Sequence, residues 1–412
     1  MASSGGGGAG GGPSSSSSPS PKILLAKPGL VAGGPSSAGK FMRGVSGEDE
    51  SSLSAASIRS RLPPVGSLNL LSDSWDFHFD RFLPFLTDNT DFTVVGIIGS
   101  PGVGKSTIMN EIYGFDPTSP GMLPPFAIQS EETRANARHC TIGIEPRISA
   151  ERIILLDTQP VFSPSVLAEM TRPDGSSTVP VLGGETLSSE LAHELLSIQL
   201  GVLLSSVCHV LLVVSEGVHE SNLWRLMSTV DLLKHDLPDP SSVASHLQSS
   251  SSGTDKDNKD KIHEGGEYMT TPVFIHTKLR DEDFSANSCE QMKKVLAQCF
   301  QSSSFTKSTV NDRVPYSKSH CDQDTGADPK MLDLFLVPKR KDNSLELRYE
   351  SCDSMLWRIR DHILSMARPS FSRTVSERDW LKNTAKIWEL VKNSPIIAEY
   401  YRTLQNSGLY RR

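Results

Sequence analysis

The sequence predicts an α/β domain built around a doubly wound, mostly parallel sheet. Five short runs, each nearly all apolar and rich in β-branched residues, are typical of strands buried on both faces. Helical segments alternate with these runs, as in parallel sheets with helices on both sides. A glycine-rich phosphate-binding motif lies between the first run and the first helix. Together these features indicate the P-loop NTPase class, in its G-domain-like form.

The expected strands and helices follow one another in a regular order. The expected strands are 92–99, 151–160, 207–216, 271–278 and 332–340. The expected helices are 106–114, 186–206, 220–234, 289–300 and 354–367, and the second of them has an amphipathic pattern. One more helix is expected before the first strand. Its candidate caps are Ser72 and Asp73, and its apolar positions are Trp75, Phe79, Phe82 and Leu83.

Composition divides the chain into a domain and flexible parts. Residues 1–66 are rich in Gly, Ser, Pro and Ala, so they cannot bury enough apolar surface to offset chain entropy, and we expect a disordered tail. Polar insertions, also expected to be disordered, interrupt the domain at about 237–267 and 302–329. The G-like P-loop domain is therefore expected over 67–369, followed by a C-terminal helical extension over 370–412.

The C-terminal extension is expected to form one or two helices. An apolar stripe along it is approximated by Trp380, Ala385, Trp388 and Val391. Such a stripe either covers the domain or docks a partner, and the sequence leaves both interpretations open.

The composition disfavours several classes of protein. A net charge of −7 argues against a whole-chain nucleic-acid binder. The six cysteines are scattered without a CxxC pair, which favours reduced cytosolic thiols over a disulfide framework or a zinc site. No run reaches the ~18 consecutive apolar residues of a membrane span, and the N-terminus does not resemble a signal peptide. We therefore expect a cytoplasmic protein with no membrane partner and no direct contact with nucleic acid.

The phosphate-binding motif has the form G-x-x-x-x-G-K-[ST]. Its glycines allow backbone N–H groups to turn toward phosphate oxygens, and the helix behind it directs the positive end of its dipole at the anion. The Lys105 ammonium can reach the β and γ phosphates, and the Ser106 hydroxyl can ligate Mg²⁺. The residues expected to hold the nucleotide here are Gly99, Ser100, Pro101, Gly102, Val103, Gly104, Lys105, Ser106 and Thr107.

Two more residues are candidates for magnesium ligands. Asp157 ends the second expected strand, where P-loop proteins place the carboxylate that holds Mg²⁺, often through water. Thr141 lies between the P-loop and that strand, at a position where such proteins have switch I. The expected metal set is therefore Ser106, Thr141 and Asp157.

The segment after Asp157 lacks the features of an active switch. A Ras-like switch needs Asp-x-x-Gly, whose glycine N–H contacts the γ-phosphate. Here Pro160 takes the place of that glycine, and proline has no N–H to donate. The next position, which often holds the glutamine that orients water, is Val161, and Gln159 comes two positions earlier. We therefore expect no catalytic residue and little or no hydrolysis.

The base-recognition motif is also incomplete. Guanine readers carry [NT]KxD after a strand, and Thr277 and Lys278 fit its first two positions. Arg280 stands where the aspartate should be, and Asp281 comes one residue later. The stem of Lys278 can still pack on a purine ring. The expected ligand is therefore a purine nucleoside di- or triphosphate, GTP, GDP or ATP, and its base stays open.

Several strings together are more specific than the P-loop alone. They are VVGIIGSPGVGKS, ERIILLDTQPVFSPSVL, VCHVLLVV, MARPSFSRTVSERDW and TAKIWELVKNSPIIAEY. With them the sequence resembles the SMG-nine family of G-domain-like nonsense-mediated mRNA decay factors. The resemblance covers about 72–404, with the tail and both insertions outside it, and LLDTQP and SMARPS are its most specific parts.

The resemblance implies a regulatory or scaffold subunit rather than an enzyme. Members of that family pair with a second G-like subunit, SMG-eight, and bind the phosphoinositide-3-kinase-related kinase SMG-one. The family's nucleotide-site residues match at 99–106, and Asp157 matches within the shared DTQP. The implied partners are an SMG-eight-like subunit, in a heterodimer, and an SMG-one-like kinase. The alternative is an active GTPase or ATPase of the P-loop type that needs a partner for catalysis.

Overall fold

The computed structural model describes residues 68–407, except for 73–74, 117, 119–122, 137, 172–180, 183–184, 187, 219, 252–267, 308–331, 341–349 and 368. These residues belong to one compact unit, Pro63–Arg412. The expected tail, 1–66, lies outside the described residues, as do the later parts of both expected insertions.

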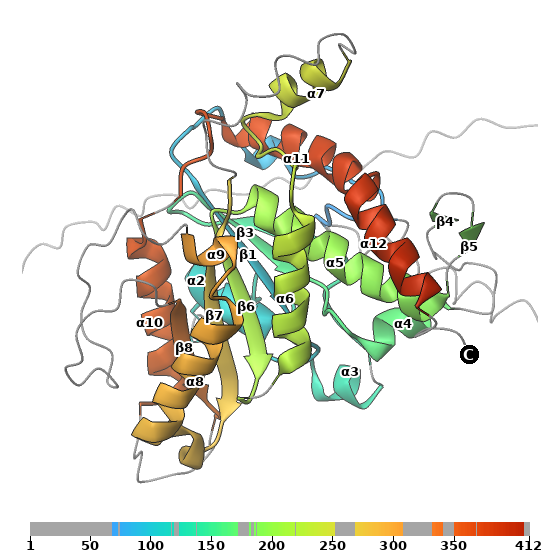
Figure 1. Ribbon diagram of the computed structural model, residues 1–412. Helices are drawn as coiled ribbons and strands as arrows, with labels where there is room; N and C mark the ends of the chain where they lie inside the picture. The colour runs from blue at the N-terminus through green and yellow to red at the C-terminus, as the bar shows by residue number, and fades with distance from the viewer. Residues whose placement is uncertain are drawn as a thin grey trace, which may run out of the picture. The chain divides into compact units, whose positions relative to one another are not determined.

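A six-stranded sheet forms the centre of the fold, with the strand order β2-β3-β1-β6-β7-β8 (Figure 1). The strands are β1 Thr93–Gly99, β2 Ile144–Ile148, β3 Ile153–Thr158, β6 Val210–Glu216, β7 Thr271–Leu279 and β8 Asp333–Pro338. Only β2 runs antiparallel to its neighbour; the other neighbouring pairs of this sheet are parallel. The predicted mostly parallel sheet is confirmed.

The longer helices follow the strands in the expected alternation. They are α2 Lys105–Tyr113, α5 Ser189–Val207, α6 Ser221–Leu233, α8 Ala286–Cys299, α10 Cys352–Ser365, α11 Glu377–Lys392 and α12 Pro395–Asn406. Shorter elements are η1 Leu83–Phe85, α3 Glu131–Ala135, α4 Pro164–Met170, α7 Val243–Ser251, η3 Asp281–Phe284, α9 Ser304–Lys307 and a two-stranded pair, β4 Val181–Leu182 with β5 Glu185–Thr186.

The two faces of the sheet are covered by different helices. Side chains alternate between the faces along β1. Val95 and Ile97 belong to a buried cluster that includes residues of α2 and α10. Val94 and Ile98 belong to a second cluster, with residues of α5, α6 and α11. This arrangement is the doubly wound fold that the sequence predicts, and it brings the end of β1 and the start of α2 to one edge of the sheet.

Helix α5 is not the amphipathic surface helix that its pattern suggests. From Leu195 to Val207 every residue is buried, polar ones included. The sheet covers one side of this helix, and α6 and α11 pack against others. A helix enclosed in this way needs no polar face.

Two parts of the chain before β3 differ from the expectations. The helix expected around Trp75 is wrong: residues 75–82 form none, Leu71 and Phe77 form an isolated bridge, and only η1 follows. The reason is tertiary, because the Leu70 N–H donates to the Ile144 carbonyl at 2.8 Å and so pairs this segment with β2. Strand β2 itself is not among the expected strands; it contains Pro146 and lies at the edge of the sheet, where proline is tolerated.

The C-terminal stripe covers the domain. Trp380 and Trp388 of α11 are fully buried. The Trp380 Nε1–H donates to the Val207 carbonyl at 2.9 Å, and the Trp388 Nε1–H donates to the Trp75 carbonyl at 2.7 Å. Of the two interpretations, the first therefore applies to these tryptophans.

The start of the first expected insertion has regular structure. Helix α7 lies within it, and the buried Asp239 accepts hydrogen bonds from Ser241, Ser242 and Ser372. The rest of this insertion, 252–267, lies outside the described residues. The same holds for 308–331, which includes most of the second expected insertion. Among the described helices, none combines the length and the apolar character that crossing a membrane requires.

Candidate nucleotide site

The loop between β1 and α2 has the conformation that its glycines allow. Gly102 and Gly104 have φ angles of 72° and 95°, in the left-handed region that favours glycine. Gly99 is required for a different reason, since a Cβ there would lie 2.1 Å from the Val214 carbonyl oxygen. Gly104 is also the N-cap residue of α2, which begins at Lys105. The loop thus leads directly into a helix N-terminus, as a phosphate cradle requires.

The Lys105 side chain folds over this loop. It is buried, and its Nζ donates to the carbonyls of Gly99 at 3.0 Å and Ser100 at 3.1 Å. Burial lowers the pKa of Lys105 to about 8, although the charges of Asp157 and Glu220 oppose that shift. At neutral pH the ammonium therefore stays mostly charged, beside the loop where a phosphate would bind.

The three candidate magnesium ligands lie together. The Ser106 hydroxyl donates to Asp157 Oδ2 at 2.7 Å, and the Thr141 hydroxyl donates to the same oxygen at 2.9 Å. The two hydroxyl oxygens are 3.4 Å apart. Burial raises the pKa of Asp157, opposed by the charge of Lys105 and by both hydroxyl donors. A set of hydroxyl and carboxylate oxygens suits Mg²⁺, which takes oxygen ligands and keeps several waters.

The segment after β3 has its amide groups committed to the protein. Gln159 donates its N–H to the Gly143 carbonyl at 2.9 Å and accepts the Gly143 N–H on Oε1 at 3.0 Å. Pro160 has no N–H. The Val161 N–H, next in line, donates to the Gly99 carbonyl at 3.2 Å. Gln159 lies two residues before the usual position of the water-orienting glutamine. It is bonded to the backbone of Gly143, the residue just before β2.

Thr277 ties the end of β7 to the phosphate loop. Its hydroxyl donates to the Val103 carbonyl at 2.9 Å and to the Ser215 carbonyl at 3.1 Å. Lys278 follows with a φ of 57°, and its Nζ pairs with Glu216 at 2.8 Å. The incomplete base-recognition motif, Thr277 and Lys278, thus lies beside the phosphate loop, at the edge of the sheet where β1 and β6 end.

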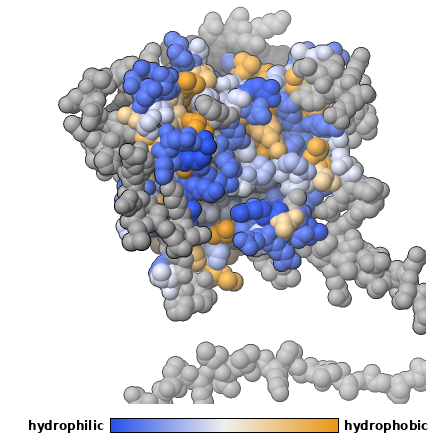
Figure 2. Space-filling model, turned by 90° about the horizontal axis from the view of Figure 1, so that it is seen from below, coloured by the Kyte–Doolittle hydropathy of each residue, from blue (hydrophilic) through white to orange (hydrophobic). Residues whose placement is uncertain are grey.

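A hollow of about 490 Å³ adjoins Lys278. Its lining residues are Glu216, Gly217, Val218, Glu220, Lys278, Arg280 and Asp283. Arg280 belongs to the lining, whereas Asp281 does not and is an exposed residue at the start of η3. Figure 2 views the molecule from below Figure 1, the side toward which β6 and β7 run, and hydrophilic residues alternate there with smaller apolar areas.

Glu220 is a residue of this edge that the sequence analysis missed. One carboxylate oxygen accepts the Ser100 hydroxyl, and the other accepts the Glu216 N–H at 3.0 Å. It therefore joins the phosphate loop to the end of β6. The signal in the sequence is an acidic residue at the start of the helix after the third expected strand, which is too common to single out.

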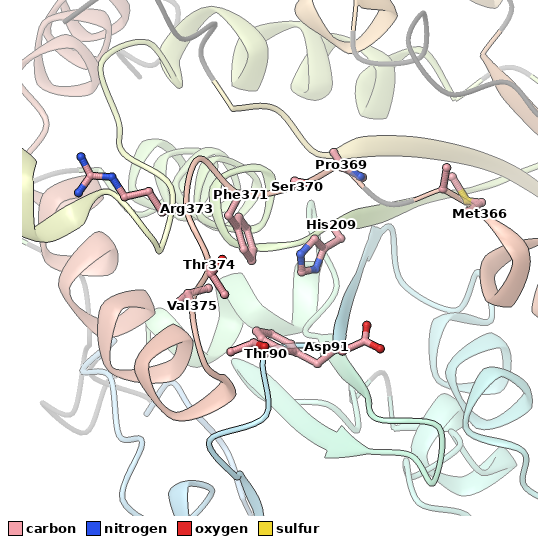
Figure 3. A pocket seen from close by; sticks show the side chains of 12 residues that line it. Thr90, Asp91, His209, Met366, Pro369, Ser370, Phe371, Arg373, Thr374 and Val375 are labelled. Atoms are coloured by element: carbon pink, nitrogen blue, oxygen red, sulfur yellow. The ribbon is translucent and has the colours of Figure 1, made fainter.

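A second cavity, also about 490 Å³, contains none of the expected site residues (Figure 3). It lies at the end of the sheet opposite the phosphate loop, where the chain enters β1 and β6. His209 lines it, accepts the Val94 N–H on Nδ1 at 2.9 Å and packs on Phe371 with ring centres 4.2 Å apart. These contacts hold the start of β1 and the segment after α10 together.

Comparison with known proteins identifies relatives of the chain. No family model matches it. Nonsense-mediated mRNA decay factor SMG9 of Xenopus laevis is 34% identical over 350 residues, which cover 79% of this chain and 64% of the relative. The Salmo salar protein of that name is 28% identical over 360 residues, covering 82% and 67%. The chain thus spans a little under two thirds of the Xenopus relative's length.

Among solved structures, a septin GTPase domain from Chlamydomonas reinhardtii is similar at 12% identity and a TM-score of 0.26, covering 76% of this chain and 98% of that one. Neither the fold nor the site described above rests on that likeness. The sequence matches confirm the resemblance inferred from the strings around the P-loop and the DTQP segment. The chain is therefore a homologue of these SMG9 proteins.

Proposed function

We propose that this chain is a regulatory or scaffold subunit in nonsense-mediated mRNA decay that binds a purine nucleotide with Mg²⁺ and hydrolyses it little or not at all. The relatives of this chain are nonsense-mediated mRNA decay factors by name, which supports the pathway. One observation carries the biochemical part. A complete phosphate loop lies beside a turn whose amides are absent or already bonded, at Pro160 and Val161.

The phosphate loop supports nucleotide binding through three features. Its glycines permit the backbone to wrap an anion, and α2 directs its N-terminus at the same place. Lys105 provides a charge that needs only to exchange two loop carbonyls for phosphate oxygens. The residues proposed to contact the phosphates are those from Gly99 to Thr107.

The oxygen cluster behind the loop supports a magnesium ion. Ser106 would bind the ion directly, as the P-loop hydroxyl does, and Asp157 would hold it directly or through water. Thr141 reaches the same carboxylate oxygen and would approach the ion from the β2 side. The ion would neutralise phosphate charge and orient the nucleotide.

The turn after β3 supports slow hydrolysis. Hydrolysis in such a site needs an oriented water and donors at the γ-phosphate. Gln159 is 7% exposed, and its side-chain oxygen accepts the Gly143 N–H. No side chain from 159 to 161 therefore remains to orient water.

On the base side we propose Thr277 and Lys278 as contacts. The Lys278 stem would pack on the purine ring once its ion pair with Glu216 opens, and that pair is solvent-exposed and hence cheap to break. GTP, GDP and ATP all fit these contacts.

The proposed partners are an SMG-eight-like subunit, which would form a heterodimer with this chain, and an SMG-one-like kinase. They follow from the resemblance in the sequence. No direct contact with nucleic acid or membrane belongs to this proposal, and the proposed compartment is the cytoplasm.

Mass spectrometry of the nucleotide released from the purified chain tests the proposal. The expected result is one purine nucleotide per chain, absent from Lys105→Ala and retained in Lys382→Ala, whose lysine lies on α11 in an exposed pair with Asp379. Protein that takes up no purine nucleotide even at millimolar supply would refute nucleotide binding. Rapid hydrolysis that appears only when the SMG-eight-like subunit is added would favour an active NTPase.

A further inference from the structure

Two segments flank the candidate site on its β2–β3 side. We call residues 139–143 the lead-in, because they run into β2. We call residues 159–163 the exit, because they leave β3. In Ras-like proteins the corresponding segments are free to respond to the γ-phosphate, as an order–disorder switch. Here both segments are bonded to each other and to the rest of the domain.

Gln159 joins the two segments by completing the β-ladder with its side chain. The register pairs Ile144 with Thr158, so the next pair outward is Gly143 with Gln159. The main-chain half of that pair is present, Gln159 N–H to Gly143 carbonyl at 2.9 Å. The other half comes from the side chain, whose Oε1 accepts the Gly143 N–H at 3.0 Å. The ladder thus continues one residue beyond β3 although Pro160 follows.

The bond is buried, and glycine is needed opposite it. Gln159 is 7% exposed. Gly143 has a φ of 59°, and a Cβ there would lie 2.5 Å from the Leu71 carbonyl oxygen. A buried N–H without its acceptor is costly, so this side-chain bond holds the lead-in in place.

A second connection joins the lead-in to the helix behind the exit. His139 Nδ1 lies 2.8 Å from the Ser165 hydroxyl of α4, and its Nε2 lies 3.5 Å from Glu169 of the same helix. The His139 side chain is 5% exposed. The lead-in is therefore attached at both of its ends.

The exit is fixed to β1. Its Val161 N–H donates to the Gly99 carbonyl at 3.2 Å, and just before the exit the hydroxyl of Thr158, the last residue of β3, donates to the Ile97 carbonyl at 2.5 Å. Between them Pro160 offers no donor. A terminal phosphate would have to break the bond to Gly99 before it could recruit the Val161 amide.

We propose that Gln159 is the positioning residue of a clasp between the lead-in and the exit, and that this clasp keeps both segments in one conformation whether the bound nucleotide is a diphosphate or a triphosphate. The inference rests on the proposed function, because it concerns how the same nucleotide site is regulated. A ligand group that makes no differential contact shifts no equilibrium. For the lead-in and the exit the γ-phosphate is such a group, because Gln159 and Val161 are bonded within the protein and Pro160 has no N–H.

Calorimetry and hydrogen exchange on the full chain test the clasp. The probes are a purine nucleoside diphosphate and the non-hydrolysable triphosphate analogue of the same base, both with Mg²⁺. Calorimetry establishes that both nucleotides are bound, and we then expect equal exchange of peptides covering 139–163 in the two complexes. Exchange of these peptides that slows with the triphosphate alone would overturn the clasp.

Variants separate the clasp from general stability. Gln159→Ala should speed exchange of the Gly143 amide by about tenfold and make that exchange sensitive to the third phosphate, because Thr141 can then move with the metal. Gln298→Ala, on the exposed face of α8, is the control and should change neither quantity. If Gln159→Ala folds and exchanges like wild type, Gln159 holds no clasp.

The two proposals fail in different ways. Wild-type protein that binds neither nucleotide refutes the proposed function, and the clasp with it. Binding of both nucleotides with exchange of 139–163 that differs between the two complexes refutes only the clasp.

Discussion

The two sides of the candidate site are built differently. On the β1–α2 side, backbone glycines, a helix N-terminus and a buried lysine are arranged around a loop that can hold an anion. On the β2–β3 side, the groups that would report the terminal phosphate are missing or bonded within the protein, as at Pro160 and Gln159. Under the proposed function, the contrast means that holding a nucleotide and sensing its last phosphate are separate tasks of this fold.

Lys105→Ala should have the largest effect on nucleotide affinity, because it removes the buried positive charge on the β1–α2 side of the site. Losing one partner of a buried charge pair lowers affinity by at least about hundredfold. Isothermal titration with the nucleotide found in the purified protein measures it. Lys382→Ala is the matched control, since that lysine lies on the surface of α11. Equal affinity of Lys105→Ala and wild type would place the anion elsewhere and break the comparison.

Asp157→Asn should weaken magnesium-dependent binding by about tenfold to hundredfold. Asparagine keeps an acceptor for the Ser106 and Thr141 hydroxyls, so the fold should persist while the charge that attracts the metal is lost. Titrations with and without Mg²⁺ separate the two contributions. A loss of the same size in the presence of EDTA would mean that Asp157 acts on the loop and not on a metal.

Raising the pH should weaken nucleotide binding in the range around pH 8. The pKa of Lys105 is lowered by burial to about 8, so the free site is mostly charged at pH 7 and mostly neutral at pH 9. Binding of a phosphate favours the charged form, so above pH 8 the site must first take up a proton, which costs about tenfold in affinity between pH 7 and 9. Calorimetry in buffers of different ionisation enthalpy would detect that proton. An affinity that rises over this range contradicts the assignment.

Pro160→Gly should have the smallest effect. Glycine restores an N–H beside the terminal phosphate, but Gln159 would still be bonded to Gly143 and no residue would orient water. Turnover should therefore change by less than about threefold, well below the usual contribution of an oriented acid–base group. A large rise would show that the missing amide alone separates the two sides of the site.

Local patterns in the sequence predicted how the residues of the β1–α2 side are arranged, and their role in holding a nucleotide stays a prediction. The P-loop lies between a buried apolar run and a helix, and Asp157 ends the neighbouring run. Because parallel strands end at one edge of the sheet, Asp157 comes to lie beside Ser106 of the P-loop, and Thr141 bonds to the same carboxylate. The bond between Thr277 and the loop carbonyl of Val103 depends on the same edge, although the motif itself says nothing about that contact.

The β2–β3 side of the site was harder to predict because its contacts are non-local. Strand β2 contains a proline and alternates weakly, so only its pairing with β3 makes it a strand. Gln159 stands two residues before the usual position of the water-orienting glutamine, and its bond to Gly143 depends on the register of that pair. The expected helix around Trp75 failed for a similar reason, since tertiary pairing with β2 outweighed its helical spacing.

Single-turnover hydrolysis by the purified chain tests the central claim most directly. Wild-type protein, loaded with the triphosphate form of its own nucleotide and Mg²⁺, should retain it and hydrolyse it at or below about 10⁻³ s⁻¹, the scale of an unassisted Ras-like site. Fast hydrolysis by the isolated chain that disappears in Lys105→Ala would contradict the claim that this site holds a nucleotide without acting on it.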